Sequence, residues 1–236
     1  MKKFYRLFTF CILPSFLLAT PSVAKEKFYV GASYGIGIAN KFDYYKDEGM
    51  AMVRPKNSQL FGLSLGYKLN DNIRTELALN HFNKFEYKNT IRSYDNATKA
   101  LVSEDYYNQI ISANAIFANL YFDTSKFGEF KPYVNIGLGV SRNKAGDLEV
   151  KEEGKDANGN SFKIEDVHAS GTAKSKFAWN VGAGLSYEVN KKLTLDLISY
   201  KYYDLGKIST GPDSDGDYLK VRLKIHGINT GIRLKF

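Results

Sequence analysis

Histidines are the residues of this chain whose chemistry is easiest to judge from their neighbours. The chain contains three of them, His81, His168 and His226. A hydrolytic site of the acid–histidine–serine type needs a carboxylate that orients the imidazole and a hydroxyl within its reach. No such set is recognisable around any of the three. We therefore expect no catalytic residues and no enzyme activity.

Two Asp-rich segments resemble calcium-binding loops. They are residues 156–160, DANGN, and residues 213–217, DSDGD. A helix–loop–helix calcium site needs glycine at the sixth position of its loop and glutamate at the twelfth. Neither segment has them, so we interpret both as solvated turns. No metal and no cofactor are expected.

Charged side chains of both signs recur at alternate positions in segments that have the pattern of strands. The set is Lys68, Arg74, Glu76, Glu188, Asp196, Arg233 and Lys235. Successive side chains of a strand point to opposite faces, and each of these charges lies opposite an apolar face. If the strands close into a barrel of eight, its lumen is filled by side chains, and buried charges there must be paired. We expect a structural ion network, with a proton or ion path as the alternative.

The last stretch, residues 218–236, is the strand around which the chain is organised. Its apolar face from residue 228 is Ile228, Thr230, Ile232, Leu234 and Phe236. Its other face is Asn229, Gly231, Arg233 and Lys235. A period of two means that the strand meets different solvents on its two sides. In a closed barrel it pairs with the first strand, residues 28–39, and its apolar face meets lipid.

Six further segments complete the predicted strand set. They are residues 59–69, 73–85, 107–122, 132–141, 176–189 and 193–205, and only the faces of 107–122 stay unassigned. Short connections fall near 70–72, 123–130 and 190–192, and long ones near 40–57, 88–105, 142–175 and 206–217. This alternation predicts an all-β fold. It is an eight-stranded antiparallel transmembrane β-barrel with short periplasmic turns and four long external loops.

Side-chain alternation breaks at two places. The apolar residues between 219 and 225 are odd-numbered, whereas those after Gly227 are even-numbered. A β-bulge near His226 would restore one apolar face, and a second is expected near Ile198. The alternative is that the upper part of each strand stands clear of the membrane. Tyrosines near the strand ends are expected to anchor the barrel at the membrane interfaces. They include Tyr29, Tyr67, Tyr121, Tyr133 and Tyr187.

The first 24 residues have the composition of a signal peptide. Lys2, Lys3 and Arg6 precede an apolar run at residues 8–18, and Ser22-Val23-Ala24 is a small-residue cleavage site. The barrel domain is then 25–236, without Cys11. Removing the three basic residues of the leader leaves 30 Lys and Arg against 25 Asp and Glu, a net charge of +5. That mild, dispersed excess predicts no nucleic-acid partner.

Four stretches resemble the small outer-membrane barrel superfamily of OmpA, OmpX, OmpW and the opacity proteins. They are KPYVNIGLGV (131–140), WNVGAGLSYEVN (179–190), LDLISYKYYDLG (195–206) and TGIRLKF (230–236). Loop lengths and the Lys- and Tyr-rich composition resemble most the rickettsial surface adhesins. The resemblance implies a bacterial outer-membrane location, contact with membrane lipid, and assembly by the outer-membrane insertion machinery. It also implies adhesion to host surface or serum proteins such as vitronectin.

The external loops are where such binding is expected, because loops on a rigid scaffold commonly carry function. The candidate residues are Lys144, Lys151, Lys155, Lys163, Lys174, Lys176 and, in the fourth loop, Lys207. The loop at 142–176 interleaves lysines with acids, so we expect it to lack a core and to be mobile. A narrow OmpW-like channel for small or apolar solutes is the alternative function. The loops could also be solvated caps.

Overall fold

The computed structural model describes residues 27–40, 55–95, 100–155, 160–212 and 218–236. The predicted signal peptide lies outside these residues. Within them, no helix is long and apolar enough to cross a membrane. The described residues form ten strands: β1 (Phe28–Ala39), β2 (Ser58–Lys68), β3 (Ile73–Tyr94), β4 (Leu101–Asp123), β5 (Phe130–Ala145), β6 (Leu148–Lys155), β7 (Ser161–Ala169), β8 (Thr172–Glu188), β9 (Leu193–Pro212) and β10 (Tyr218–Lys235).

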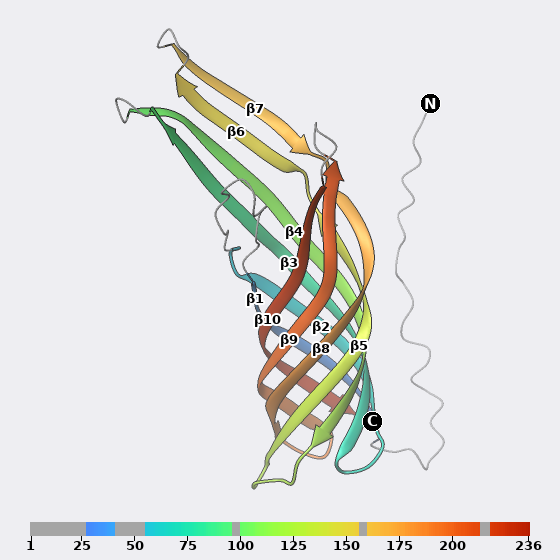
Figure 1. Cartoon of the computed structure of the whole chain (residues 1–236). Coiled ribbons are helices and arrows are strands. Elements are labelled where there is room, and N and C mark those ends of the chain that lie inside the picture. The colour runs from blue at the N-terminus through green and yellow to red at the C-terminus, as the bar shows by residue number, and fades with distance from the viewer. Residues whose placement is uncertain (1–26, 41–54, 96–99, 156–159, 213–217) are drawn as a thin grey trace, which may run out of the picture.

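Eight of these strands close into a ring of antiparallel neighbours (Figure 1). The ring runs β1, β2, β3, β4, β5, β8, β9, β10 and back to β1. The closing pair is β1 with β10, in register from Tyr29 opposite Lys235 to Ala39 opposite Ile225. The predicted all-β barrel, with its last strand paired to its first, is confirmed.

Three short connections lie at one end of the ring, which we call the short-turn end. Two of them are built alike. Asn70 Oδ1 accepts hydrogen bonds from the backbone N–H groups of Asn72 and Ile73, at 2.9 and 2.8 Å. Asn190 Oδ1 accepts from Lys192 and Leu193 at the same distances. An asparagine that bonds the backbone two residues on fixes a tight turn.

The third short connection joins β4 to β5 and ends in a tight reversal. Phe127 and Phe130 exchange two backbone hydrogen bonds, at 2.9 and 3.2 Å. Only two residues remain between them, and Gly128 has a φ of +61°. A side chain at that φ would clash with the backbone, so glycine is the residue that closes this turn at low cost.

The outer wall of the ring is apolar. Large apolar side chains on it are about half exposed, among them Leu63, Leu77, Ile136, Leu138 and Ile232. A continuous apolar band of this kind would be unfavourable in water, whereas the hydrocarbon of the membrane solvates it. The described wall therefore has the lipid-facing surface that the alternation predicts.

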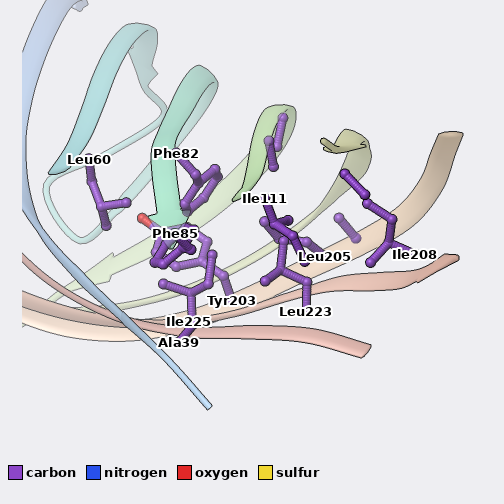
Figure 2. Packing of buried hydrophobic residues seen from close by; sticks show 14 of the residues in the cluster. Ala39, Leu60, Phe82, Phe85, Ile111, Tyr203, Leu205, Ile208, Leu223 and Ile225 are labelled. Carbon is purple, nitrogen blue, oxygen red and sulfur yellow. The ribbon is translucent and has the colours of Figure 1, made fainter. Parts of the chain in front are cut away.

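The inner wall is apolar only in the half of the barrel away from the short-turn end. Figure 2 shows this luminal apolar cluster, to which β1, β2, β3, β4, β9 and β10 all contribute. Phe85, Phe117, Leu205, Leu223 and Ile225 are completely buried in it. The upper lumen is therefore packed with hydrocarbon side chains, which gives it no room for a column of water.

This cluster explains why the alternation breaks in β10, and the bulge expected near His226 is wrong. Odd-numbered side chains point inward along the described strand, from Leu223 and Ile225 through Asn229 to Arg233. The pairing of β10 with β1 is continuous through Gly227. What changes at this level is the lumen, from polar to apolar, and not the direction of the side chains.

The change of the lumen from polar to apolar also explains why the faces of β4 could not be assigned from the sequence. Its odd-numbered residues from Ile111 to Asp123 are buried, and the even-numbered residues from Asn114 to Phe122 are exposed. Apolar side chains occupy both faces because one meets lipid and the other meets the luminal apolar cluster. The bulge expected near Ile198 is present, since β9 shifts register against both neighbours there.

Beyond the barrel, β3 and β4 continue and pair with two extra strands (Figure 1). β6 pairs with the outer part of β4, and β7 pairs with β6. We call this four-stranded extension the external sheet. It corrects the expectation of a mobile loop over 142–176, because Leu148–Lys155 and Ser161–Ala169 are hydrogen-bonded strands. Alternation of lysine with glutamate had suggested solvation, yet it also suits cross-strand charge pairs.

Replacing Phe117 by alanine tests the packing of the luminal apolar cluster. Phe117 is fully buried, so its removal should lower the free energy of unfolding by about 3–5 kcal/mol. Reversible urea unfolding in phospholipid vesicles measures this. The control is Ile116→Ala, because Ile116 faces lipid and lipid can fill the space left behind. Equal losses in the two variants would contradict a packed lumen.

Candidate functional site

Arg74 is the centre of a buried polar network in the short-turn half of the lumen. Its Nε lies 3.1 Å from an oxygen of Asp123, and its Nη1 lies 3.7 Å from Glu76. Nη1 also donates to the Tyr29 hydroxyl at 3.0 Å. All three charged side chains are at least nine-tenths buried. A cation between two carboxylates is the arrangement that lets charges persist in such a site.

Tyrosines complete this network. The hydroxyls of Tyr29 and Tyr121 donate to the two oxygens of Glu76, at 3.0 and 2.9 Å. The Arg74 guanidinium carbon lies 3.7 Å from the Tyr121 ring centroid, a cation–π contact. Lys201 Nζ donates to the Tyr121 hydroxyl at 2.9 Å. Glu76 is therefore satisfied by neutral donors as well as by charge.

The other predicted luminal charges form separate pairs around this centre. Arg233 contacts Asp196 through two hydrogen bonds, at 2.8 and 3.0 Å. Glu188 pairs with Lys235 at 3.0 Å and with Lys126. Lys68 pairs with Asp71 in the exposed turn. The expectation that Glu188 shares one network with Arg74 is wrong, because Glu188 lies near the barrel rim within reach of two lysines.

Sequence reasoning missed the partners that matter most. Asp123, Lys201 and the luminal tyrosines were not among the predicted charges. Asp123 has the parity of Asn119 and Tyr121, but the faces of its strand could not be assigned. Tyr29, Tyr121 and Tyr133 are 3–4% exposed inside the lumen. They are not the interfacial anchors expected, whereas Tyr67 and Tyr187 do pack against Phe28 and Phe130 at the short-turn end.

The lumen is sealed along its described length. Between the two halves, Asn135 donates to Asn180 at 2.7 Å and Asn180 donates to Asn119 at 2.9 Å. Two luminal cavities have volumes of about 40 and 20 Å³. A cavity needs about 10–15 Å³ to hold one ordered water. These two cavities therefore hold a few waters and are too small for a larger solute.

The external sheet has two faces of different chemistry. One continues the outer wall of the barrel and is crossed by ion pairs, and we call it the paired face. Arg92 contacts Glu104 at 2.7 Å. Lys163 contacts Glu153 at 2.9 Å, and Lys151 contacts Glu165 at 3.0 Å. The hydrogen bond from Lys151 lowers the pKa of Glu165, and Glu153 raises the pKa of Lys163.

The opposite face continues the lumen side of β4, and we call it the lumen-side face. Asp105 and Glu152 lie directly opposite each other on it, and Tyr107 lies opposite Val150. Neither carboxylate has an ion pair with any described residue. An exposed apolar side chain lies beside them, because Ile164 is opposite Glu152 on the neighbouring strand and is 53% exposed. This face therefore carries apolar surface and unbalanced negative charge side by side.

The seven predicted ligand-binding lysines do not form one patch. Lys151 and Lys163 are engaged in ion pairs on the paired face, and Lys155 ends the same strand as Lys151. The others are exposed on three further strands: Lys144 on β5, Lys174 and Lys176 on β8, and Lys207 on β9. Most residues of the two Asp-rich segments lie outside the described residues.

Two of the histidines have ordinary hydrogen-bond partners. His81 Nδ1 lies 2.7 Å from Asn114 Oδ1. His226 lies 2.6 Å from the Tyr200 hydroxyl and 3.1 Å from Asn40. The side chain of His168 lies outside the described part of the chain. In the described part, these contacts assemble neither an oriented base nor an adjacent nucleophile.

The closed ring, the lipid-facing wall and the sealed lumen define a small bacterial outer-membrane β-barrel protein. The chain belongs to the family described as outer membrane protein beta-barrel domain, whose model matches residues 8–236. Its location is the bacterial outer membrane.

Relatives and solved structures agree with this family. An uncharacterized Brucella abortus protein is 27% identical over 204 residues, covering 77% of this chain and 69% of the relative. A 31 kDa outer-membrane immunogenic protein of Brucella melitensis is 36% identical over 63 residues, 27% of this chain and 25% of the relative. Neisserial surface protein A is 18% identical with a TM-score of 0.51, covering 89% and 97% of the two chains. OprG from Pseudomonas aeruginosa is 15% identical with a TM-score of 0.50, covering 90% and 97%. The two structures share the fold.

Replacing Arg74 by alanine tests the luminal network. The change leaves Asp123 and Glu76 buried without their cation, which should lower the free energy of unfolding by about 3–5 kcal/mol. Urea unfolding in vesicles measures the loss. Lys68→Ala is the control and should change little, because its pair with Asp71 is exposed to solvent. A stable Arg74→Ala barrel would mean that water reaches these carboxylates.

The stability of the barrel at low pH depends in part on Glu86, which lies outside the membrane-spanning part of β3. Lys88 and Lys56 lower its pKa from 4.5 to about 2. A carboxylate with a lowered folded-state pKa contributes stability above pH 4.5 that is lost as the pH falls toward 2. NMR titration of the refolded barrel should show Glu86 titrating near that lower value. In Lys56→Gln/Lys88→Gln it should return toward 4.5, and titration at 4.5 in the unaltered protein would contradict these pairs.

Proposed function

We propose that this protein is a surface adhesin whose external sheet binds host surface or serum proteins of the vitronectin class. Support comes first from the lumen, whose cavities of about 40 and 20 Å³ leave no solute path. A narrow channel for small or apolar solutes is therefore the less favoured function. The proposal is non-catalytic and includes a cleaved signal peptide and assembly by the outer-membrane insertion machinery through β10.

The observation that carries the proposal is the lumen-side face of the external sheet. Like charges directly opposite each other destabilise a sheet, and Asp105 faces Glu152 in this way. One oxygen of Asp105 is buried from solvent without a hydrogen-bond partner. A partner that brings a lysine or arginine to this pair, and an apolar side chain to Ile164, would satisfy both kinds of surface.

The paired face is a less suitable binding surface. Its cations and carboxylates already neutralise one another across the strands. A partner would have to displace these pairs and desolvate them, which offsets what it gains. Lys151 and Lys163, predicted from the sequence as ligand-binding residues, are for this reason assigned to the stability of the sheet.

Bacteria displaying the barrel provide the test. Ile164→Ser and Asp105→Asn/Glu152→Gln should each reduce attachment to immobilised vitronectin or to host cells by roughly fivefold or more, because a central contact costs over about 1 kcal/mol when it is removed. The amount of barrel on the cell surface and the change in its gel mobility on heating should both stay unchanged, because the substitutions lie outside the barrel ring.

Lys151→Gln/Glu165→Gln is the matched control. It removes one pair from the paired face of the same hairpin and should leave attachment intact. Full attachment by the lumen-side variants would mean that the binding site does not lie on the lumen-side face. Full attachment after residues 148–169 are replaced by a tight turn would end the proposal that this hairpin binds the host.

A further inference from the structure

The outer wall of β3, β4, β5 and β8 shows where the membrane hydrocarbon ends. One cross-strand row on it is fully apolar, and consists of Leu79, Ile116, Val140 and Phe177. These side chains are 52–64% exposed. The next row away from the short-turn end is polar, and consists of His81, Asn114, Arg142 and Ser175. The lipid headgroups of the external leaflet therefore lie at the level of this polar row.

Two cations project from the wall at that level. Arg142 and Lys144 are two residues apart on β5, so their side chains share a face and their Cα atoms are about 7 Å apart. Both are exposed, and neither has an ion pair with any residue that the structure describes. Lys84 is exposed in the bulge of β3, where the register shifts around Ser112 of β4, the residue opposite Lys144.

Two polar side chains of the facing wall have partners within the protein. At the corresponding level, Arg222 contacts Asp204 at 2.8 Å. His226 is held between Tyr200 and Asn40. Arg222 and His226 are therefore satisfied by neighbours in the protein, whereas Arg142 and Lys144 have no ion pair with a described residue.

An apolar hollow lies on the same wall and extends from the middle of the membrane toward the short-turn end, where Phe28 and Tyr67 also line it. It has a volume of about 620 Å³, and Leu77, Leu120, Ile136 and Leu138 are among its lining residues. It forms where the small side chain of Ala118 stands between Leu77 and Leu138 in one row. Leu138 is four residues from Arg142 along β5, about 13 Å in an extended strand. One acyl chain could occupy the hollow while its headgroup reaches the cations.

We propose that Arg142 and Lys144 bind the phosphate of an anionic lipid in the external leaflet, with an acyl chain of that lipid in the hollow at Ala118. Arginine offers a planar fork of donors that matches phosphate oxygens, and lysine adds a point charge. The site is separate from the proposed adhesin face, and it assigns Lys144 to lipid instead of to a host protein.

Detergent-solubilised refolded barrel can be titrated with bisphosphorylated lipid A, with phosphatidylglycerol and with phosphatidylcholine, using native mass spectrometry to measure the bound lipid. A cation near an anionic lipid surface contributes about 1 kcal/mol, or about fivefold in Kd. Arg142→Gln/Lys144→Gln should therefore weaken lipid A binding by roughly 25-fold. Lys191→Gln/Lys192→Gln, the same charge change at the short-turn end, should leave it unchanged.

Ala118→Leu tests the hollow separately. It fills the space on a lipid-exposed surface, so folding should persist and lipid binding should weaken without a change in its salt dependence. Binding of lipid A alone would identify a phosphorylated glycolipid as the ligand, and binding of both anionic lipids would identify any anionic headgroup phosphate. Equal Kd values for the unaltered barrel and Arg142→Gln/Lys144→Gln, or equal binding of phosphatidylcholine, would overturn the site.

Discussion

Pairing of β1 with β10 is the constraint on which the rest of the structure depends. Hydrocarbon offers no hydrogen bonds, so a sheet in the membrane must have no free edge. The last residue takes part, because the Phe236 N–H donates to the Phe28 carbonyl at 3.0 Å. Closing a ring with eight strands leaves an interior about as wide as the side chains that fill it. The sealed lumen is a consequence of that closure.

The lumen is filled in two different ways, and the division has a physical reason. In the short-turn half, charged groups and tyrosines bond one another around Arg74. In the other half, Phe82, Phe85 and Leu223 pack as in the core of a soluble domain (Figure 2). Both fillings suit a buried interior, because charged and polar groups bond one another in one half and hydrocarbon packs against hydrocarbon in the other. Function is therefore expected on the outer wall and beyond the membrane.

The ring, its turns and the bulge in β9 could be predicted from the sequence because a period of two is a local signal. The faces of β4 and the parity of β10 could not, since both require knowing that the upper lumen is apolar. The Arg74–Asp123 contact joins residues 49 positions apart, and it becomes visible only once the strands are in register. The external sheet was hidden for a similar reason, because alternating lysine and glutamate suit solvated loops as well as paired strands.

The continuity of β3 and β4 from the short-turn end to the external sheet has a mechanical consequence. Cross-strand hydrogen bonds lie perpendicular to the strands. A tether that pulls the external sheet away from the cell would apply force along the length of these strands. Their cross-strand hydrogen bonds would then be loaded in shear. Many bonds would then share the force at once, instead of opening one after another. Such a sheet can transmit tension to the barrel, which a flexible loop of the same length would dissipate by uncoiling.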